Sequence, residues 1–366
     1  MDIHFNMCKV KYSLLNELME PIFRSQPIKT LNIFINLDDL FWRFRNARVN
    51  QEFQACGTMA PKMLISNVFN LIAHYRQWGA RKNVNTKVYA YYTGAKRGFL
   101  GRIYISNYRQ YYVDKCNLGN ADVFYVNNAI QEADNLMRTI SNYIDGVYVI
   151  DTGIMEPSVL PLYIQKYIRT ADWNMLITRD EFEYQYAIAD KFSLVYPHGD
   201  SSNLITASDI WPKIAYKEKI ECPYANKYPP ALIELALTIV GNKRRDIPKI
   251  KRIGWRTLFS IVDTLAEKYN DFSEITLMNA MVDKLVGKQT SVDNINANLS
   301  VTSLRNIVNV MDDESTRTFI INQLVDIPDY QNLYELNRNP QMFASCPLNL
   351  QFLTDEGHHA SKNPFV

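Results

Sequence analysis

Residues 241–257, GNKRRDIPKIKRIGWRT, contain a cluster of basic side chains whose spacing suggests binding to a phosphate backbone. Isoleucines three residues apart precede Gly254, which is typical of a tight turn between two helices. A glycine there lets backbone amides approach a phosphate, and the free N–H groups of the next helix, beginning near Trp255, attract it. Positive side chains in the stretch would neutralise phosphates without recognising the base sequence. They are Lys243, Arg244, Arg245, Lys249, Lys251, Arg252 and Arg256. The stretch therefore predicts binding to a nucleic-acid backbone, and a solvated basic loop is the alternative.

The segments that would hold this loop are typical of an α/β sheet followed by helices. Strand-like apolar runs occupy residues 30–37, 87–94, 146–153, 174–180 and 191–197, with helical stretches between most of them, including 61–79 with a glycine stop at Gly79. This alternation predicts a mostly parallel sheet with helices on both faces. Later helices are expected over 229–242, 254–269, 273–287 and 300–311. The predicted divisions are an extension (1–29), an α/β domain (30–200), a helical region (201–345) and a tail (346–366).

Composition narrows the class of protein. Of 366 residues, 47% are hydrophobic and 21% charged, an ordinary balance for a globular chain. The net charge is only +2, so nucleic acid would have to be attracted by local patches. No apolar run is long enough to span a bilayer, the N-terminus lacks the apolar core of a signal peptide, and the five cysteines form no CxxC pair. These features predict a cytoplasmic protein without membrane contact, zinc site or disulfide framework.

Five short motifs follow one another in an order typical of one nuclease family. They are NLDDLFWR (36–43), YYTG (91–94), GIMEPS (153–158), LITRDEF (176–182) and GNKRRDIP (241–248). In this order the chain resembles the flap-endonuclease, or 5′-nuclease, family of phages, bacterial DNA polymerase I and eukaryotic replication. The resemblance covers roughly residues 30–330. It implies a PIN-like α/β domain followed by a helical portion that contains a helix–hairpin–helix.

The same motifs lack most of the acids that the family uses to bind metal. Positions expected to carry carboxylates or their neighbours hold Asn36, Thr93, Ser158, Phe182, Asn242 and Arg245, whereas Glu156 and Asp180 are retained. Two-metal hydrolysis of a phosphodiester needs clustered carboxylates, and neutral side chains bind Mg²⁺ far more weakly. Arg245 adds a fixed cation that would repel a metal and could pair with Glu156 or Asp180. The resemblance thus implies a degenerate pocket with no cofactor, and an active enzyme would need Mg²⁺ or Mn²⁺.

Nearby acids could still form a displaced metal site. Asp38 is the candidate that would join Glu156 and Asp180, and other acids near the motifs are Asp39, Asp151, Glu181, Glu183 and Asp246. For four of these acids, another role is favoured over metal binding. Asp38 or Asp39 would cap the helix after the first strand. Glu181 and Glu183 would be surface acids at the start of a helix, where the helix dipole favours negative charge.

A second basic region lies after the second strand. Its candidate DNA-binding residues are Lys96, Arg97, Arg102 and Arg109. The stretch SNYRQYYVDK (106–115) is dense in tyrosine and could stack on unpaired bases, as the family's arch does over single-stranded DNA. A core helix with a tyrosine-rich face explains the same pattern equally well.

The loss of acids and the retention of basic residues favour binding over cleavage. The favoured function is a non-catalytic 5′-nuclease-like protein that binds the DNA backbone, or branched or single-stranded DNA, as an accessory or scaffolding subunit. The alternatives are an active metal-dependent 5′-nuclease with displaced ligands, and a phage structural or assembly protein that no longer binds DNA. Predicted partners are DNA and proteins of a replication or phage assembly. A phage origin would place the protein in the host cytoplasm or on the virion.

Overall fold

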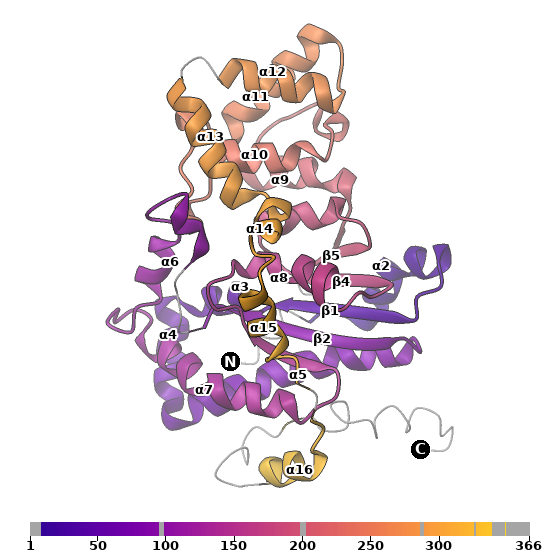
Figure 1. Cartoon of the computed structure of the whole chain (residues 1–366), viewed down its shortest axis with the longest axis vertical. Helices are drawn as coiled ribbons and strands as arrows, with labels where there is room; N and C mark the ends of the chain where they lie inside the picture. Colours follow the sequence, from indigo (N-terminus) through magenta and orange to yellow (C-terminus); the bar gives the residue numbers. More distant parts are fainter. Residues whose placement is uncertain are drawn as a thin grey trace.

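The computed structural model describes residues 9–94, 99–197, 203–285, 289–325, 327–338 and 348. A sheet of six strands lies below a stack of helices (Figure 1). Its order is β3 (Val147–Asp151), β2 (Asn85–Tyr92), β1 (Thr30–Asn36), β4 (Trp173–Ile177), β5 (Phe192–Tyr196) and β6 (Asn203–Ile205). The first five strands of this order run parallel, and β6 is antiparallel to β5. The predicted mostly parallel α/β sheet is confirmed.

Both faces of the sheet are buried, which explains why its strands are almost continuously apolar. Ile33 and Ile35 on β1 pack in one core with α5 (Ala60–Arg81) and α7 (Phe124–Asn142), which lie beneath the sheet. The residue between them, Phe34, points to the opposite face because side chains alternate along a strand. There its ring lies 4.9 Å from that of Tyr89, which in turn lies 5.0 Å from Tyr148 on the next strand. The larger helical part covers this second face.

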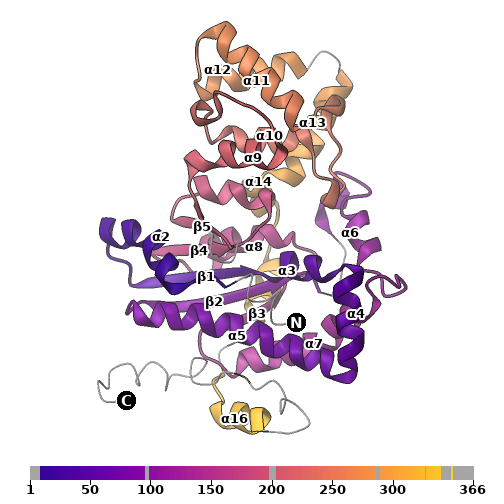
Figure 2. The same cartoon turned by 180° about the vertical axis from the view of Figure 1, so that it is seen from behind.

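Further helices extend both ends of the α/β part. At one end of the sheet, α2 (Tyr12–Ser25) shares the core that contains α5, and the Tyr12 hydroxyl donates to the His74 carbonyl on α5 at 2.9 Å. Next to α7 lies α4 (Ala47–Cys56). The upper stack, best followed in Figure 2, consists of α9 (Ile210–Glu218), α10 (Leu232–Val240), α11 (Trp255–Tyr269), α12 (Glu274–Leu285) and α13 (Gln289–Thr302). The predicted helical C-terminal part is therefore confirmed.

After α13 the chain returns to the sheet. The returning helices are α14 (Leu304–Val310), α15 (Glu314–Ile321) and α16 (Tyr330–Arg338). The Ile327 amide donates to the Asn142 carbonyl at the end of α7, at 3.2 Å, and Leu333 belongs to the core beneath the sheet. The last helices thus pack on the α/β part, and the division into residues 30–200 and 201–345 stays a prediction. Among the described helices, none is both long and apolar enough to cross a membrane.

Two local expectations about helix ends were wrong. Gly79 does not stop α5, which continues to Arg81; a Cβ at Gly79 would lie 2.1 Å from Thr86 Oγ1, so glycine is needed for the close approach of the helix to β2. The single helix expected over 300–311 is two helices, because the Ser303 hydroxyl accepts a hydrogen bond from the Asn306 amide at 3.2 Å and caps α14. Gly241, by contrast, does end α10, with a φ of +65°.

Gly241→Ala is expected to lower the free energy of unfolding by about 2 kcal/mol or more. An alanine Cβ there would meet the Ile247 carbonyl oxygen at 2.4 Å, in a left-handed backbone that disfavours side chains. Urea denaturation would measure the loss. Gly119→Ala is the control, because the nearest atom to its Cβ, Asn117 Oδ1, is 3.5 Å away. Equal stability of the two variants would contradict this account.

Candidate functional site: acids and arginines at the edge of the sheet

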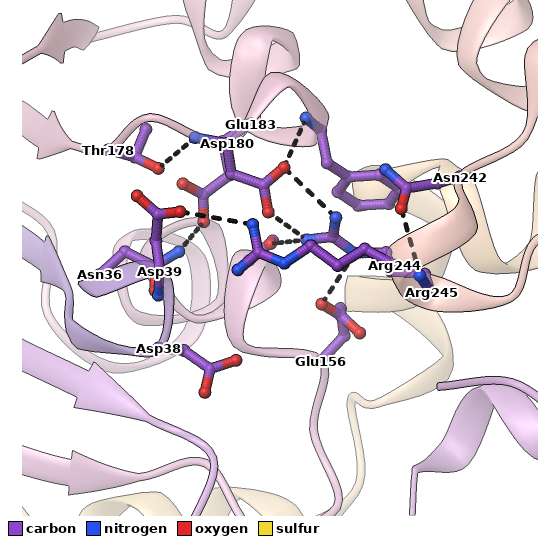
Figure 3. Close-up of polar contacts among 12 residues, drawn as sticks. Asn36, Asp38, Asp39, Glu156, Thr178, Asp180, Glu183, Asn242, Arg244 and Arg245 are labelled. Carbon is purple, nitrogen blue, oxygen red and sulfur yellow. Dashed lines mark hydrogen bonds and ion pairs between the residues drawn. The ribbon is translucent and has the colours of Figure 1, made fainter. Parts of the chain in front are cut away.

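Five buried acids meet where the parallel strands end. Asp38 and Asp39 lie on α3 (Leu37–Phe44) after β1, Glu156 follows β3, and Asp180 and Glu183 follow β4. Because the carboxyl ends of parallel strands share one edge, residues distant in sequence converge there (Figure 3). Three arginines from two other segments join them, namely Arg109, Arg244 and Arg245. These eight residues are called the acid–arginine cluster below.

Arg245 is the central cation of the cluster and is only 2% exposed. Its Nη2 donates to Asp180 Oδ2 at 2.6 Å and to Ser158 Oγ at 2.9 Å, while Nη1 lies 3.3 Å from Asp180 Oδ1. Its Nε donates to Glu156 Oε1 at 3.4 Å. The guanidinium lies over the Phe182 ring, 4.0 Å from its centroid. The predicted pairing of Arg245 with Glu156 or Asp180 is therefore present with both acids.

Arg109 is the second buried cation, and its predicted contact with DNA was wrong. The residue is 4% exposed, and its Nε and Nη2 grip the two oxygens of Glu156 at 3.0 and 2.7 Å. Its Nη1 also donates to Asp38 Oδ2 at 3.4 Å. Tyr108 donates to Glu156 at 2.6 Å and Tyr112 donates to Asp38, so these tyrosines line the core rather than an outer face. Charge pairing with two buried acids draws this arginine inward, a contact that sequence order alone does not reveal.

Arg244 closes the cluster on the side nearer solvent. Its Nη1 lies 3.4 Å from Asp39 Oδ1, and its guanidinium stacks 4.6 Å from the Trp42 ring centroid. Trp42 also stacks on Tyr112, with the ring centroids 5.4 Å apart. Arg244 is half-buried, with 27% of its side chain exposed, so much of its charge is directed to Asp39 rather than to solvent.

Asn36 caps α3 and also donates a hydrogen bond to Glu183. The sequence analysis had assigned the cap to Asp38 or Asp39. The Asn36 Oδ1 accepts a hydrogen bond from the Asp39 amide at 3.0 Å, so Asn36, and not Asp38 or Asp39, caps α3. Its Nδ2 donates to Glu183 Oε1 at 2.8 Å, and Tyr91 donates to the same oxygen at 3.2 Å. Glu183 is fully buried, which corrects its expected place on the surface. The neutral amide can serve as donor and acceptor at once, which a carboxylate at that position could not.

The positions that the sequence predicted for the degenerate pocket lie together in the structure. They are Asn36, Thr93, Glu156, Ser158, Asp180, Phe182, Asn242 and Arg245. Thr93 donates to Asp38 Oδ2 at 3.4 Å, and the Asn242 side chain accepts from the Arg245 amide at 3.1 Å, which orders the turn that delivers Arg245. Three other acids near the motifs serve elsewhere: Asp151 accepts from the Gly94 amide, Glu181 pairs with Lys217, and Asp246 accepts from the Tyr111 amide.

Glu183 is the acid of the cluster that the sequence analysis placed on the surface, although it is buried. It lies three residues after Asp180, at the start of the 3-10 helix Glu181–Ile188. Residues three apart share a face in a 3-10 helix, because that helix has three residues per turn. This spacing was the available signal that the two acids point the same way.

Charge and burial act in opposite directions on the acids. Burial alone would raise the pKa of Asp180, but the charges of Arg245 and Arg244 outweigh it and hold that pKa well below its ordinary value. The pKa of Glu156 is likewise lowered, because Arg109 and Arg245 overcome the effect of burial. Burial and the negative charge of Asp180 instead raise the pKa of Glu183 to about 8. Glu183 is therefore protonated at neutral pH.

The residues do not fit a divalent metal ion while Arg245 is in place. In the described part of the chain, no group of three or more histidine, cysteine or acidic side chains is arranged to hold one. In addition, the guanidinium of Arg245 contacts the oxygens of Asp180 and Glu156 that would face an ion. Asp38, the third candidate ligand, accepts from Tyr112 and Arg109 instead.

The basic loop, residues 241–257, runs from the end of α10 into the first turn of α11 and keeps several cations exposed. They are Lys243, Lys249, Arg252 and Arg256. Gly254 is the N-cap of α11, and Trp255 at its first position packs against Phe259 at 6.3 Å. Arg102 is half-buried and donates to the Tyr108 carbonyl at 3.2 Å. The predicted Lys96 and Arg97, and the side chain of Lys251, lie outside what the structure describes.

This sheet, its flanking helices and the acids at its carboxyl edge define a 5′-nuclease-like fold. Similar solved structures include T5 5′-exonuclease with bound divalent metal ions (zinc), which has a TM-score of 0.51 and 16% identity and for which 80% of this chain covers 98% of the other. The T5 D15 protein co-crystallised with metal ions has a TM-score of 0.48 and 15% identity over the same shares. No protein-family model and no curated protein matches the sequence. The resemblance seen in the motifs is thus confirmed at the level of the fold.

Proposed function

We propose that this protein is a non-catalytic 5′-nuclease-like protein that binds the phosphate backbone of branched or single-stranded DNA. The observation that carries the proposal is Arg245, whose guanidinium lies between Asp180 and Glu156 at the edge of the sheet. A buried, permanently charged arginine neutralises the acids that hydrolysis would need for divalent ions. The pocket then has no means to activate water or to stabilise a leaving oxygen through metal.

The basic loop supports the binding half of the proposal. Its exposed cations are Lys243, Lys249, Arg252 and Arg256, and Arg252 and Arg256 flank Gly254, the N-cap of α11. Lysine and arginine contacts with phosphates release condensed counterions and carry no base sequence information. Because the net charge is only +2, the affinity for DNA would come from this local patch. In this role the protein would be an accessory or scaffolding subunit of a replication or phage assembly.

A cleavage assay tests the catalytic half. We expect a labelled 5′-flap DNA incubated with the protein and either Mg²⁺ or Mn²⁺ to stay intact. Cleavage that disappears in Asp180→Ala would instead establish an active metal-dependent nuclease and would contradict the proposal. Cleavage that persists in Asp180→Ala would point to a contaminating enzyme.

Arg252→Ala tests the binding half. We expect it to weaken binding of the same flap DNA, measured by fluorescence anisotropy, and to reduce the slope of log affinity against log salt by about 1. Arg24→Ala is the matched control, because Arg24 is an exposed arginine on α2, far from the loop, with 78% of its side chain accessible. No binding at low salt, or equal effects of the two substitutions, would sink the assignment of DNA binding to the loop.

A further inference from the structure

We propose that a second cavity, separate from the acid–arginine cluster and lined by none of its members, binds a nucleoside monophosphate. The cavity has a volume of about 320 Å³, which lies in the range of small-ligand sites. Its walls come from α7, the end of β2 and the segment that includes the end of α6 (Gln110–Lys115). The inference does not rest on DNA binding by the basic loop, because the two sites share no residue.

The cation of this cavity is Arg45, the C-cap of α3. Its Nε donates to Asn127 Oδ1 at 2.8 Å, whereas its Nη1 is a buried donor with no hydrogen-bond partner among the described residues. The Asn127 Nδ2 is a second such donor, on a side chain that is only 3% exposed. Buried donors without partners are costly, and an anion with several acceptor oxygens would satisfy both. A phosphate group meets this requirement.

Contacts between α4 and α7 hold the two donors in place. Asn50 on α4 donates through Nδ2 to the Ala121 carbonyl at 3.0 Å and accepts from the Val126 amide at 3.1 Å. The Arg45 guanidinium also lies 5.5 Å from the centroid of the Tyr112 ring. The donors are therefore positioned before a ligand arrives, which is what a specific site requires.

The opposite end of the cavity carries an acceptor, Asp134. Asn127, Gln131 and Asp134 share one face of α7, because they are four and three residues apart. A rise of about 1.5 Å per residue places Asp134 roughly 10 Å from Asn127 along the helix. Asp134 accepts from Tyr92 and, at 2.8 Å, from Arg138, and a carboxylate can accept further hydrogen bonds. A sugar hydroxyl or a base amine would donate to it.

Apolar side chains in the cavity would pack against a flat ring. They are Val113, Leu118 and Ile130. Asn117 and Gln131 line the cavity at exposed positions, and their amides offer donors and acceptors to the edge of a base. A cavity with apolar walls and a few polar groups is the usual composition of a small-ligand site. A nucleoside monophosphate supplies the anion, the ring and the hydrogen-bond donor that these features would recognise.

Binding of AMP, measured by isothermal titration calorimetry, tests the inference. We expect the wild type to bind AMP, and Arg45→Met and Asn127→Asp each to weaken binding by about tenfold or more, because each removes a donor to the phosphate. Asn127→Asp keeps an oxygen that accepts from Arg45 Nε and should preserve the fold, which circular dichroism checks. Arg48→Met is the matched control: 88% of the Arg48 side chain on α4 is exposed, and its loss should change the AMP affinity by less than about twofold.

Adenosine and inorganic phosphate test the two ends of the cavity separately. Each should bind more weakly than AMP, because each can reach only one end. If a DNA strand with a 5′-phosphate competes with AMP and the same strand with a 5′-hydroxyl does not, the nucleotide is the end of a strand. If neither competes, it is a free nucleotide.

Three results would overturn the inference. They are no AMP binding by the folded wild type, equal AMP affinities of the wild type, Arg45→Met and Asn127→Asp, and adenosine or phosphate that binds as tightly as AMP. Arg252→Ala should keep the AMP affinity of the wild type, because Arg252 lies on the basic loop. Failure of the loop to bind flap DNA would therefore refute the proposed function and leave this site standing.

Discussion

Arg109→Met is expected to lower the free energy of unfolding by about 3–5 kcal/mol, the usual effect of removing one partner of a buried ion pair. Arg109 makes a two-pronged contact with Glu156, at 3.0 and 2.7 Å, and also reaches Asp38. Methionine fills similar space but leaves both carboxylates without this partner. Equilibrium urea denaturation at neutral pH would measure the loss.

Two further variants give this prediction its controls. Arg109→Met/Glu156→Gln should recover part of the lost stability, because a neutral amide no longer needs a buried cation. Arg102→Met is the matched control: Arg102 is half-buried in the same segment and donates to the Tyr108 carbonyl and Gln110, so its loss should change stability by about 1 kcal/mol or less. A loss for Arg109→Met no larger than for Arg102→Met would show that the cluster does not depend on this pair.

Glu183→Gln is expected to stabilise the protein, and more so as the pH rises. Burial and the charge of Asp180 raise the pKa of Glu183 to about 8 in the folded state, above its value in an unfolded chain. Between the two pKa values the unfolded chain has lost the proton and the folded chain keeps it, so the wild type loses stability as pH rises through this window. Glutamine has no proton to lose and can still accept the hydrogen bonds from Asn36 and Tyr91. The gain at pH 8 should be on the order of a few kcal/mol.

Thermal unfolding of both proteins from pH 4 to pH 9 would measure this effect. The two unfolding temperatures should converge at pH 4, where Glu183 is protonated in both states. Glu314→Gln serves as the control, since 84% of that side chain is exposed and its change should show no such pH dependence. A constant difference between Glu183→Gln and the wild type across the range would contradict the raised pKa.

Much of the fold could be predicted because it follows from local patterns. The sequence predicted strands β1 to β5 and helices α5, α10, α11 and α12 within a few residues of their observed bounds, since apolar runs and helical periodicity are properties of short segments. Errors arose where a distant contact overrode the local signal. Gly79, next to Thr86, illustrates this, because the packing of a helix on a strand set the need for glycine, and not the end of the helix.

Some residues of the candidate site could likewise be predicted from the sequence, and others could not. The five motifs identified Glu156, Asp180 and Arg245, because order along the chain pointed to residues that meet at one edge of the sheet. Arg109 and Glu183 were assigned to the surface, although both are buried. The sequence around a basic or acidic residue does not show which distant residue it will pair with. Burial of a charge is decided by that partner, which here lies 47 residues away for Arg109 and Glu156.

The sequence by itself determined the parallel sheet, the helical C-terminal part, the basic loop with its exposed cations and the replacement of acids by Asn36, Thr93 and Asn242. Each of these follows from residue type and spacing within a segment. Only the tertiary structure decided where the charges go. Arg245 and Arg109 lie inside, against acids from other segments, because a buried charge is tolerated only beside its opposite. Because these arginines pair with the acids, the acids at the edge of the sheet are not available to bind a metal ion.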